Sequence, residues 1–263
     1  MEHYSRRYIM SNSAYDGIAL ANKLLGALRG GERVAAHADT LGNLTRVQAL
    51  EVQTNILRGL GTAVSGWKVS LLPDGDLVSA PIVAERVFRS SADVGGSQYG
   101  WAGVESEIAF RLARSPGGSA RVITRDEVID SVEGACAAIE VCQSRWSSTV
   151  TPPRNAMVAD LLANGALIVG PLEKEWQHLD FSRVNARLRI NDKTIRESPG
   201  RADGDLIDLV VRLANDLRSR GMKLEAGQVI TTGSYTGLYP VVTGDRIAVE
   251  FDRIAPVTAT LKP

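Results

Sequence analysis

Cysteine is nearly absent from this chain of 263 residues, which contains only Cys136 and Cys142. The two residues form no CxxC pair, so neither a disulfide framework nor a zinc knuckle follows from them. Their spacing favours two reduced thiols that are buried as small apolar side chains.

Long apolar runs and an excess of charge are also missing. No run reaches the roughly 18 apolar residues expected of a membrane span, and residues 1–8 lack the apolar segment of a secretory signal. The 30 lysines and arginines balance 30 aspartates and glutamates, so the net charge does not favour nucleic acid as a partner. We therefore expect a cytoplasmic protein that binds neither membrane nor nucleic acid.

Several common catalytic signatures are absent as well. The sequence has no G-x-S-x-G elbow, no Walker loop and no G-x-G-x-x-G, so a serine hydrolase, an NTPase or a nicotinamide enzyme has no local support. Histidine is scarce, because the chain contains only His3, His37 and His178. All three lie in polar stretches without the spacing of metal ligands, which indicates surface positions.

The N-terminal part of the chain carries two helical patterns. Residues 14–29 have an apolar stripe at helical spacing. Thr45 and Gln48 have the spacing of a capping box, which predicts the start of a second helix. Together these patterns predict a small helical cap over residues 1–64.

From residue 65 onward, short β-like runs alternate with turns rich in Gly, Pro, Asn and Asp. The predicted strands cover residues 66–71, 87–88, 103–114, 137–141, 167–169, 187–196 as a hairpin, 229–232, 247–251 and 256–261. A capping box at Thr124 and Glu127 and an apolar stripe over 206–217 predict two further helices. The expected fold class is α+β: a mainly β mixed sheet with packed helices in a second domain over residues 65–263.

The strand over residues 103–114 is acidic on one face. Because side chains alternate along a strand, Glu105 and Glu107 share a face, and Ser106 lies on the other face among apolar residues. Two adjacent carboxylates repel each other, so the pair needs solvent, a basic partner or a cation. A solvated face is the commoner structure for this pattern, and a hard divalent cation, which prefers oxygen ligands, is the alternative.

Two further charged residues interrupt apolar runs. Glu140 lies within the apolar residues 135–142, and a carboxylate buried there needs a partner. Lys68 lies in a short, largely apolar strand, where it is either a surface lysine with a snorkelling stem or a catalytic amine. Residues 233–237 lie between two predicted strands and offer several backbone and hydroxyl donors. This segment is either a turn that binds a carboxylate or simply a tight loop.

In combination these residues resemble a known family. From about residue 12 to the C-terminus the chain resembles the 2-keto-4-pentenoate (2-hydroxypenta-2,4-dienoate) hydratases and the sister 4-oxalocrotonate decarboxylases of the fumarylacetoacetate hydrolase superfamily. The resemblance is carried by Gly66-Trp67-Lys68-Val69, Val104 to Phe110, Ala138-Ile139-Glu140-Val141 with Ser144-Arg145, Val158-Ala159-Asp160, and Thr232-Gly233-Ser234. Each segment alone is common, but their order and spacing are specific.

The resemblance implies a roll of the fumarylacetoacetate hydrolase type, with residues 65–263 as the catalytic domain. It implies a divalent metal, Mg²⁺ or Mn²⁺, whose ligands are Glu105, Glu107 and Glu140. Lys68 is expected in the active site, either for proton transfer or as the anchor of the substrate carboxylate. Further pocket residues that the resemblance suggests are Asp160 as a second catalytic candidate and Thr232 and Ser234 as substrate-binding candidates.

The activity that the resemblance implies is that of a hydratase in aromatic catabolism. Such an enzyme adds water to 2-hydroxypenta-2,4-dienoate or a related 2-oxo-4-enoic acid and forms a 4-hydroxy-2-oxo acid. Three alternatives stay open: a 4-oxalocrotonate-type decarboxylase, an acylpyruvate hydrolase, and an inactive metal-binding homologue that serves as a partner subunit. The hydrolase is the weaker of these, because hydrolytic members use a histidine near the metal. A homo-oligomer or a complex of decarboxylase and hydratase is expected.

The sequence departs from the family at two places that line its substrate pocket. Leu161-Leu162-Ala163 stands where the family often has Asn-Ala-Ser. A Pro-Asp-x-Gly segment that is common after the lysine strand has no clear equivalent around residues 79–86. These departures lie in the predicted substrate pocket and leave the predicted metal ligands unchanged.

Overall fold

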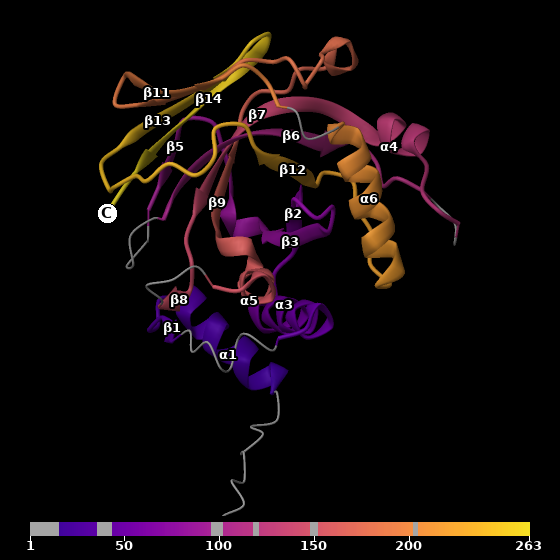
Figure 1. The fold of residues 1–263 in the computed structure, drawn as a ribbon, viewed down its shortest axis with the longest axis vertical. Helices are drawn as coiled ribbons and strands as arrows, with labels where there is room; N and C mark the ends of the chain where they lie inside the picture. The colour runs from indigo at the N-terminus through magenta and orange to yellow at the C-terminus, as the bar shows by residue number, and fades with distance from the viewer. Residues whose placement is uncertain (1–15, 36–43, 96–101, 118–120, 148–151, 202–204) are drawn as a thin grey trace, which may run out of the picture.

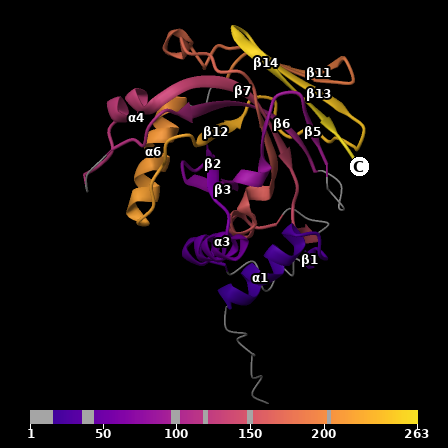
Figure 2. The same cartoon turned by 180° about the vertical axis from the view of Figure 1, so that it is seen from behind.

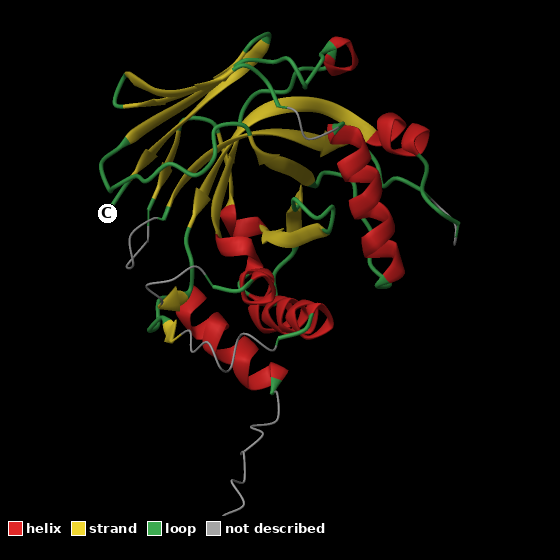
Figure 3. Ribbon diagram, viewed as in Figure 1, coloured by secondary structure: helices red, strands yellow, loops and turns green. Residues whose placement is uncertain are grey.

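Two mixed β-sheets form the body of the computed structural model, which describes residues 16–35, 44–95, 102–117, 121–147, 152–201 and 205–263 (Figure 1). One sheet has seven strands and the other has five. Both contain parallel as well as antiparallel neighbours. The predicted mainly β, α+β fold is confirmed by this arrangement, which Figure 3 shows with the helices around the sheets.

The strands of the seven-stranded sheet are, in spatial order, β3 (Leu77–Val83), β2 (Val64–Leu71), β12 (Val229–Ser234), β6 (Gly103–Leu112), β7 (Val132–Cys142), β9 (Asn164–Val169) and β4 (Val87–Arg89). The sequence analysis names no strand at β3, which contains Pro81. Proline is tolerated there because β3 lies at the edge of the sheet, where one side of the strand has no neighbour to bond.

The strands of the five-stranded sheet are, in spatial order, β11 (Lys193–Ser198), β10 (Ala186–Ile190), β13 (Arg246–Phe251), β14 (Ile254–Leu261) and β5 (Ala92–Val94). The predicted hairpin is confirmed: β10 and β11 are joined by Asn191 and Asp192, whose φ angles are +49° and +68°. A separate short pair is formed by β1 (Val34–Ala35) and β8 (Trp146–Ser147).

The main apolar core fills the space between the two sheets. Phe110 and Ile139 from the larger sheet and Leu188 and Val257 from the smaller one belong to a single buried cluster. The predicted amphipathic helix, α6 (Leu206–Ser219), adds its apolar face to the same cluster. The apolar face of β6 is therefore the core face, and the face with Glu105 and Glu107 lies on the opposite side of the seven-stranded sheet.

The two predicted capping boxes each start a helix. The capping boxes of Thr45 and Thr124 are both formed, at α3 (Arg46–Leu60) and α4 (Arg125–Ser131). Together with α1 (Gly17–Leu28), α3 lies below the sheets (Figures 1 and 2). Residue Gly61 ends α3 with a φ angle of +66°, a conformation that glycine adopts without strain.

A second apolar cluster joins the N-terminal helices to the rest of the chain. Val52 and Ile56 of α3 pack there with Ala80 of β3 and with Ala156 of α5 (Arg154–Ala159), a helix that the sequence analysis does not name. The division at residue 64 therefore stays a prediction. Three short 3-10 helices are η1 (Ala84–Arg86), η2 (Leu161–Ala163) and η3 (Trp176–His178). No helix in the described part of the chain is long and apolar enough to cross a membrane.

A candidate metal centre and active site

Three glutamates meet on the face of the seven-stranded sheet that points away from the main core. In the register of β6 and β7, Glu105 lies directly opposite Glu140, and Glu107 lies opposite Ala138. Glu140 is fully buried and Glu107 is 2% exposed, whereas Glu105 is half-buried. We call Glu105, Glu107 and Glu140 the carboxylate cluster. Its burial excludes the interpretation of this face as a solvated surface.

Lys68 reaches into the carboxylate cluster from β2. Its Nζ atom lies 2.5 Å from Oε1 of Glu140 and donates a second hydrogen bond, of 3.0 Å, to the carbonyl oxygen of Leu162. Asn164 also donates to Oε1 of Glu140, at 3.1 Å. The Lys68 side chain is only 13% exposed, so the alternative of a snorkelling surface lysine is wrong.

The electrostatics of the cluster call for additional positive charge. Burial, and then repulsion by Glu140 and Glu105, raises the pKa of Glu107 to about 8. Burial also raises the pKa of Glu105. Burial alone would lower the pKa of Lys68, but Glu140, Cys142, Glu105 and Glu107 together outweigh burial and raise this pKa above its usual value. Within the described residues neither Glu105 nor Glu107 forms an ion pair, and the positive charges of Lys68 and Arg201 only partly offset the rise in the pKa of Glu105.

These residues fit a divalent metal ion. The Oε2 atom of Glu140 is buried and accepts no hydrogen bond from any described residue, although its Oε1 atom accepts two. A buried carboxylate oxygen without a partner is unfavourable, and a cation would satisfy it. Oxygen donors from several carboxylates are the ligands that Mg²⁺ and Mn²⁺ prefer.

Replacing Glu107 with glutamine is expected to weaken divalent-metal affinity by at least about 10-fold, because a ligand charge is lost. Titration calorimetry with Mn²⁺ would measure the change. Glu133→Gln is the matched control, since Glu133 lies on β7 and pairs with Arg111 at the surface. Unchanged affinity in Glu107→Gln would remove Glu107 from the ligand set.

The C-terminal end of β12 holds the carboxylate of Glu107. The backbone N–H of Gly233 donates to Oε2 of Glu107 at 3.1 Å. The predicted carboxylate-binding segment therefore binds a carboxylate of the protein itself. Arg201, which the sequence analysis does not name, donates to the carbonyl oxygens of Thr232 and Gly233 at 2.6 and 2.7 Å. A Cβ atom on Gly233 would approach the Arg201 guanidinium to 3.1 Å, and the φ angle of +93° also favours glycine.

The two predicted substrate-binding residues on β12 differ in their surroundings. The Thr232 hydroxyl is fully buried and donates to the carbonyl oxygen of Ile108 at 2.8 Å, so it supports the backbone and is not presented to a substrate. Ser234 lies opposite Glu107 in the register of β12 and β6. Its hydroxyl has no hydrogen-bond partner among the described residues, and its role toward substrate stays a prediction.

Asp160 does not present a carboxylate for catalysis, contrary to the sequence analysis. It is 1% exposed and accepts hydrogen bonds from Nε of Arg145 at 2.5 Å, from the Arg145 backbone at 2.9 Å and from the Ser144 hydroxyl at 3.1 Å. Arg145, also buried, donates further to the carbonyl oxygen of Asn164 at 2.6 Å. Asp160 is therefore a positioning residue within a buried ion pair.

This ion pair supports an unusual backbone. Leu161, Leu162 and Ala163 are three consecutive residues with φ angles of +51°, +51° and +56°. A left-handed conformation costs an L-residue roughly 1–2 kcal/mol, so surrounding contacts must hold the turn. The turn directs the Leu162 carbonyl toward Lys68. The segment that departs from the family in sequence thus contributes a backbone acceptor to the site.

His178 is the one histidine among the described residues, and it is not part of the carboxylate cluster. His178 lies in η3 with a side chain that is 74% exposed, and its nearest charged partner is Glu175 at 3.8 Å. His3 and His37 lie outside the described residues.

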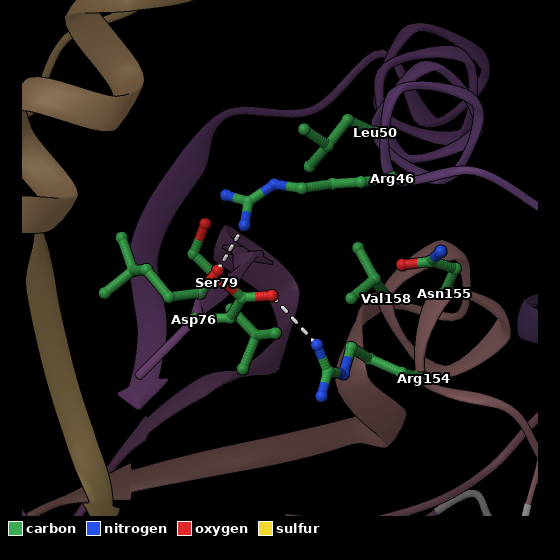
Figure 4. A pocket seen from close by; sticks show the side chains of 9 residues that line it. Arg46, Leu50, Asp76, Ser79, Arg154, Asn155 and Val158 are labelled. Atoms are coloured by element: carbon green, nitrogen blue, oxygen red, sulfur yellow. Dashed lines mark hydrogen bonds and ion pairs between the residues drawn. The ribbon is translucent and has the colours of Figure 1, made fainter. Parts of the chain in front are cut away.

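A cavity of about 150 Å³ lies between α3, β3 and α5 and contains no residue of the carboxylate cluster (Figure 4). At its rim Arg46 donates to the carbonyl oxygen of Leu77 at 2.7 Å, and Arg154 donates to Asp76 at 2.9 Å. The two arginines thereby tie α3 and α5 to the turn between β2 and β3. We interpret this cavity as a packing gap in the interface between α3, α5 and β3.

The fold and the carboxylate cluster define a protein of the fumarylacetoacetate hydrolase type. The profile of the family described as fumarylacetoacetate (FAA) hydrolase C-terminal matches residues 62–262. The chain belongs to this family, as the sequence predicts.

Curated relatives include hydratases and a decarboxylase. The chain is 29% identical over 143 residues to the 2-hydroxyhexa-2,4-dienoate hydratase of Comamonas testosteroni, a match that spans 54% of this chain and only about half, 53%, of that relative. It is 25% identical over 259 residues to the 2-oxo-hept-4-ene-1,7-dioate hydratase of Escherichia coli (91% of this chain, 95% of that protein). It is 27% identical over 231 residues to the 4-oxalocrotonate decarboxylase of Pseudomonas sp. strain CF600 (82% and 86%). The names of these relatives agree with the predicted enzyme class.

A solved structure agrees with the fold. The 4-oxalocrotonate decarboxylase from Pseudomonas putida G7, complexed with magnesium and adipate, superposes with a TM-score of 0.82 at 21% identity and covers 95% of this chain and 100% of its own. At this identity the likeness establishes the shared fold.

Proposed function

We propose that this chain is a divalent-metal-dependent hydratase that adds water to 2-hydroxypenta-2,4-dienoate or a related 2-oxo-4-enoic acid. The observation that carries the proposal is the convergence of the carboxylate cluster with the buried ammonium of Lys68. Hydratases of such acids among the relatives support the substrate class. A role in aromatic catabolism and assembly into a homo-oligomer or a decarboxylase–hydratase complex remain predictions, as does a cytoplasmic location.

In this proposal Glu105, Glu107 and Glu140 hold the ion, Mg²⁺ or Mn²⁺. The bound ion would supply Lewis-acid stabilisation of negative charge on an enolate oxygen. Solved relatives of the same fold that hold magnesium, calcium or manganese support a divalent ion.

Lys68 moves or holds a proton in the proposed reaction. Its Nζ atom is fixed by Glu140 and by the Leu162 carbonyl, so an ammonium ion is presented at a defined place beside the carboxylates. Protonation of the dienol at C5, with loss of the proton of its 2-hydroxyl group, gives an unsaturated ketone. Water then adds across the double bond, its oxygen to C4 and its proton to C3. The product is the corresponding 4-hydroxy-2-oxo acid, with one water incorporated. Lys68 either donates the proton or binds the substrate carboxylate.

The experiment that tests the proposal follows the ultraviolet absorbance of 2-hydroxypenta-2,4-dienoate with Mg²⁺ and again with excess chelator. The expected result is loss of the dienoate with formation of 4-hydroxy-2-oxopentanoate, and its suppression by the chelator. Persistence of the dienoate in a protein that has bound metal would contradict the hydratase.

The second candidate is decarboxylation of a 2-oxo diacid at the same site. It is favoured by the match to a 4-oxalocrotonate decarboxylase, which extends over 82% of this chain. Release of carbon dioxide from 4-oxalocrotonate, without consumption of the dienoate, would select this reaction. Inactivity toward every 2-oxo acid with metal bound would select the inactive partner subunit.

A further inference from the structure

One of the two cysteines lies inside the carboxylate cluster. Cys142 follows Glu140 by two residues on β7, so the two side chains share a face of the sheet. The Sγ atom of Cys142 lies 3.6 Å from Oε2 of Glu105. The sulfur and one oxygen from each of Glu105 and Glu140 all lie within 4.8 Å of one another.

We propose that Cys142 is a ligand of the metal centre, and that its sulfur gives the site a preference for a thiophilic divalent ion over magnesium. The inference rests on the metal centre of the proposed function and concerns which ion that centre selects. The thiolate of Cys142 then adds to the donors of the carboxylate cluster, on the side where Glu105 and Glu140 lie nearest to it. On binding, the thiol proton leaves to solvent and a metal–sulfur bond forms, without any oxidation or reduction.

The spacing of the donor atoms fits this assignment. A thiolate about 2.3 Å and a carboxylate oxygen about 2.0 Å from one tetrahedral zinc ion lie about 3.5 Å apart. The separation of the Cys142 sulfur and the Glu105 oxygen, 3.6 Å, is close to that value.

A second and independent observation points to a ligand at the same place. The Oε2 atom of Glu140 is buried without a hydrogen-bond partner among the described residues. Glu140 itself is fully buried, and its other oxygen is held by Lys68 and Asn164. The carboxylate therefore keeps one oxygen for an ion while its orientation is fixed by the protein.

The chemistry of sulfur determines the expected selectivity. Thiolate is a soft donor that binds zinc, cobalt and similar ions well, whereas Mg²⁺ takes oxygen ligands almost exclusively. A thiol in this position that bound no metal would only form a weak S–H···O contact with Glu105. The two cases differ in the spectrum of the metal-bound protein.

Cobalt provides the direct test, because thiolate coordination to Co²⁺ gives a sulfur-to-metal charge-transfer absorption in the near ultraviolet. We expect this absorption when the full-length, metal-free protein is titrated with Co²⁺, and its loss in Cys142→Ala. In competition titrations the ratio of Zn²⁺ to Mg²⁺ affinity should fall at least about 10-fold in Cys142→Ala. Cys136→Ala is the matched control, since Cys136 is equally buried on β7 but outside the carboxylate cluster.

The outcomes separate this inference from the proposed function. Binding of Co²⁺ without the sulfur absorption, or with an absorption that survives in Cys142→Ala, overturns the role of Cys142 and leaves the carboxylate centre standing. If Cys142→Ala leaves the ratio of Zn²⁺ to Mg²⁺ affinity unchanged, the role of Cys142 as a ligand is overturned as well. Failure of the parent protein to bind any divalent ion overturns both proposals. Circular dichroism of each variant checks that it is folded.

Discussion

Lys68→Met is expected to lower turnover by about 10²- to 10⁴-fold while the protein still binds its divalent metal. Methionine has about the length of the aliphatic stem of lysine and lacks the ammonium group. The metal ligands lie on β6 and β7, whereas Lys68 lies on β2, so the ligand set is unchanged. Turnover is measured by loss of substrate absorbance, and metal affinity by Mn²⁺ titration.

The same variant should be less stable without metal. Its substitution leaves the fully buried carboxylate of Glu140 without its cationic partner. Removing one member of a buried ion pair typically lowers the free energy of unfolding by about 3–5 kcal/mol. A bound divalent ion restores positive charge beside Glu140, so the loss measured by urea denaturation should shrink when Mn²⁺ is present.

Lys193→Met is the control, because Lys193 also lies on a strand, β11, but is exposed. It should match the parent in turnover and in stability. If Lys68→Met retained full turnover, Lys68 would be only a structural partner of Glu140. If it lost metal affinity together with turnover, the separation of ligands and proton donor proposed above would be wrong.

Local features of the fold follow from the sequence because their causes are local. The capping boxes at Thr45 and Thr124 satisfy backbone donors within one turn of helix, so residue spacing alone predicts them. The alternation in β6 likewise places Glu105 and Glu107 on one face. The strand pattern could not show that this face is buried, because the segments that cover it are distant in sequence.

The convergence of Lys68 with Glu140 depends on the whole sheet. Their strands, β2 and β7, are separated by β12 and β6, a distance of about 14 Å in a flat sheet. A contact of 2.5 Å between the side chains requires the sheet to curve. Curvature results from the packing of all strands, so no single segment predicts it. The prediction that Lys68 and Glu140 share one site therefore came from the resemblance to a family and not from the strand pattern.

The least predictable feature is the left-handed turn at residues 161–163. Leucine and alanine rarely adopt positive φ angles, and nothing in their sequence indicates this backbone. The cause lies in Arg145, whose donors bind the carboxylate of Asp160 and the carbonyl oxygens around the turn. The prediction of Asp160 as a catalytic residue is wrong, because a sequence pattern does not show that Arg145 is its buried partner.

Asp160→Asn is therefore expected to reduce stability first and activity as a consequence. Asp160 accepts three hydrogen bonds, two from Arg145 and one from Ser144. An asparagine offers one acceptor oxygen, so its amide N–H groups must face one of these donors whichever way the side chain is turned. The Arg145 side chain is 1% exposed, and leaving it unpaired should lower the free energy of unfolding by about 3–5 kcal/mol, which corresponds to a fall in Tm of roughly 10 °C.

The matched control for this prediction is Asp74→Asn. Asp74 also pairs with an arginine, Arg154, at 2.5 Å, but its side chain is 50% exposed. An exposed ion pair contributes at most about 1 kcal/mol, so Asp74→Asn should unfold close to the parent. Thermal and urea denaturation of both variants measure the difference.

Kinetics at low temperature separate a positioning role from a catalytic one. Where Asp160→Asn is still folded, relaxation of the turn moves the Leu162 carbonyl away from Lys68. We expect kcat to fall while Mn²⁺ affinity stays near that of the parent, because the metal ligands do not contact Asp160. If Asp160→Asn were as stable as the parent but had no turnover, Asp160 would be a catalytic residue after all. A stability loss with partial, metal-saturable activity would establish that the buried ion pair acts on the reaction through the backbone turn that it holds.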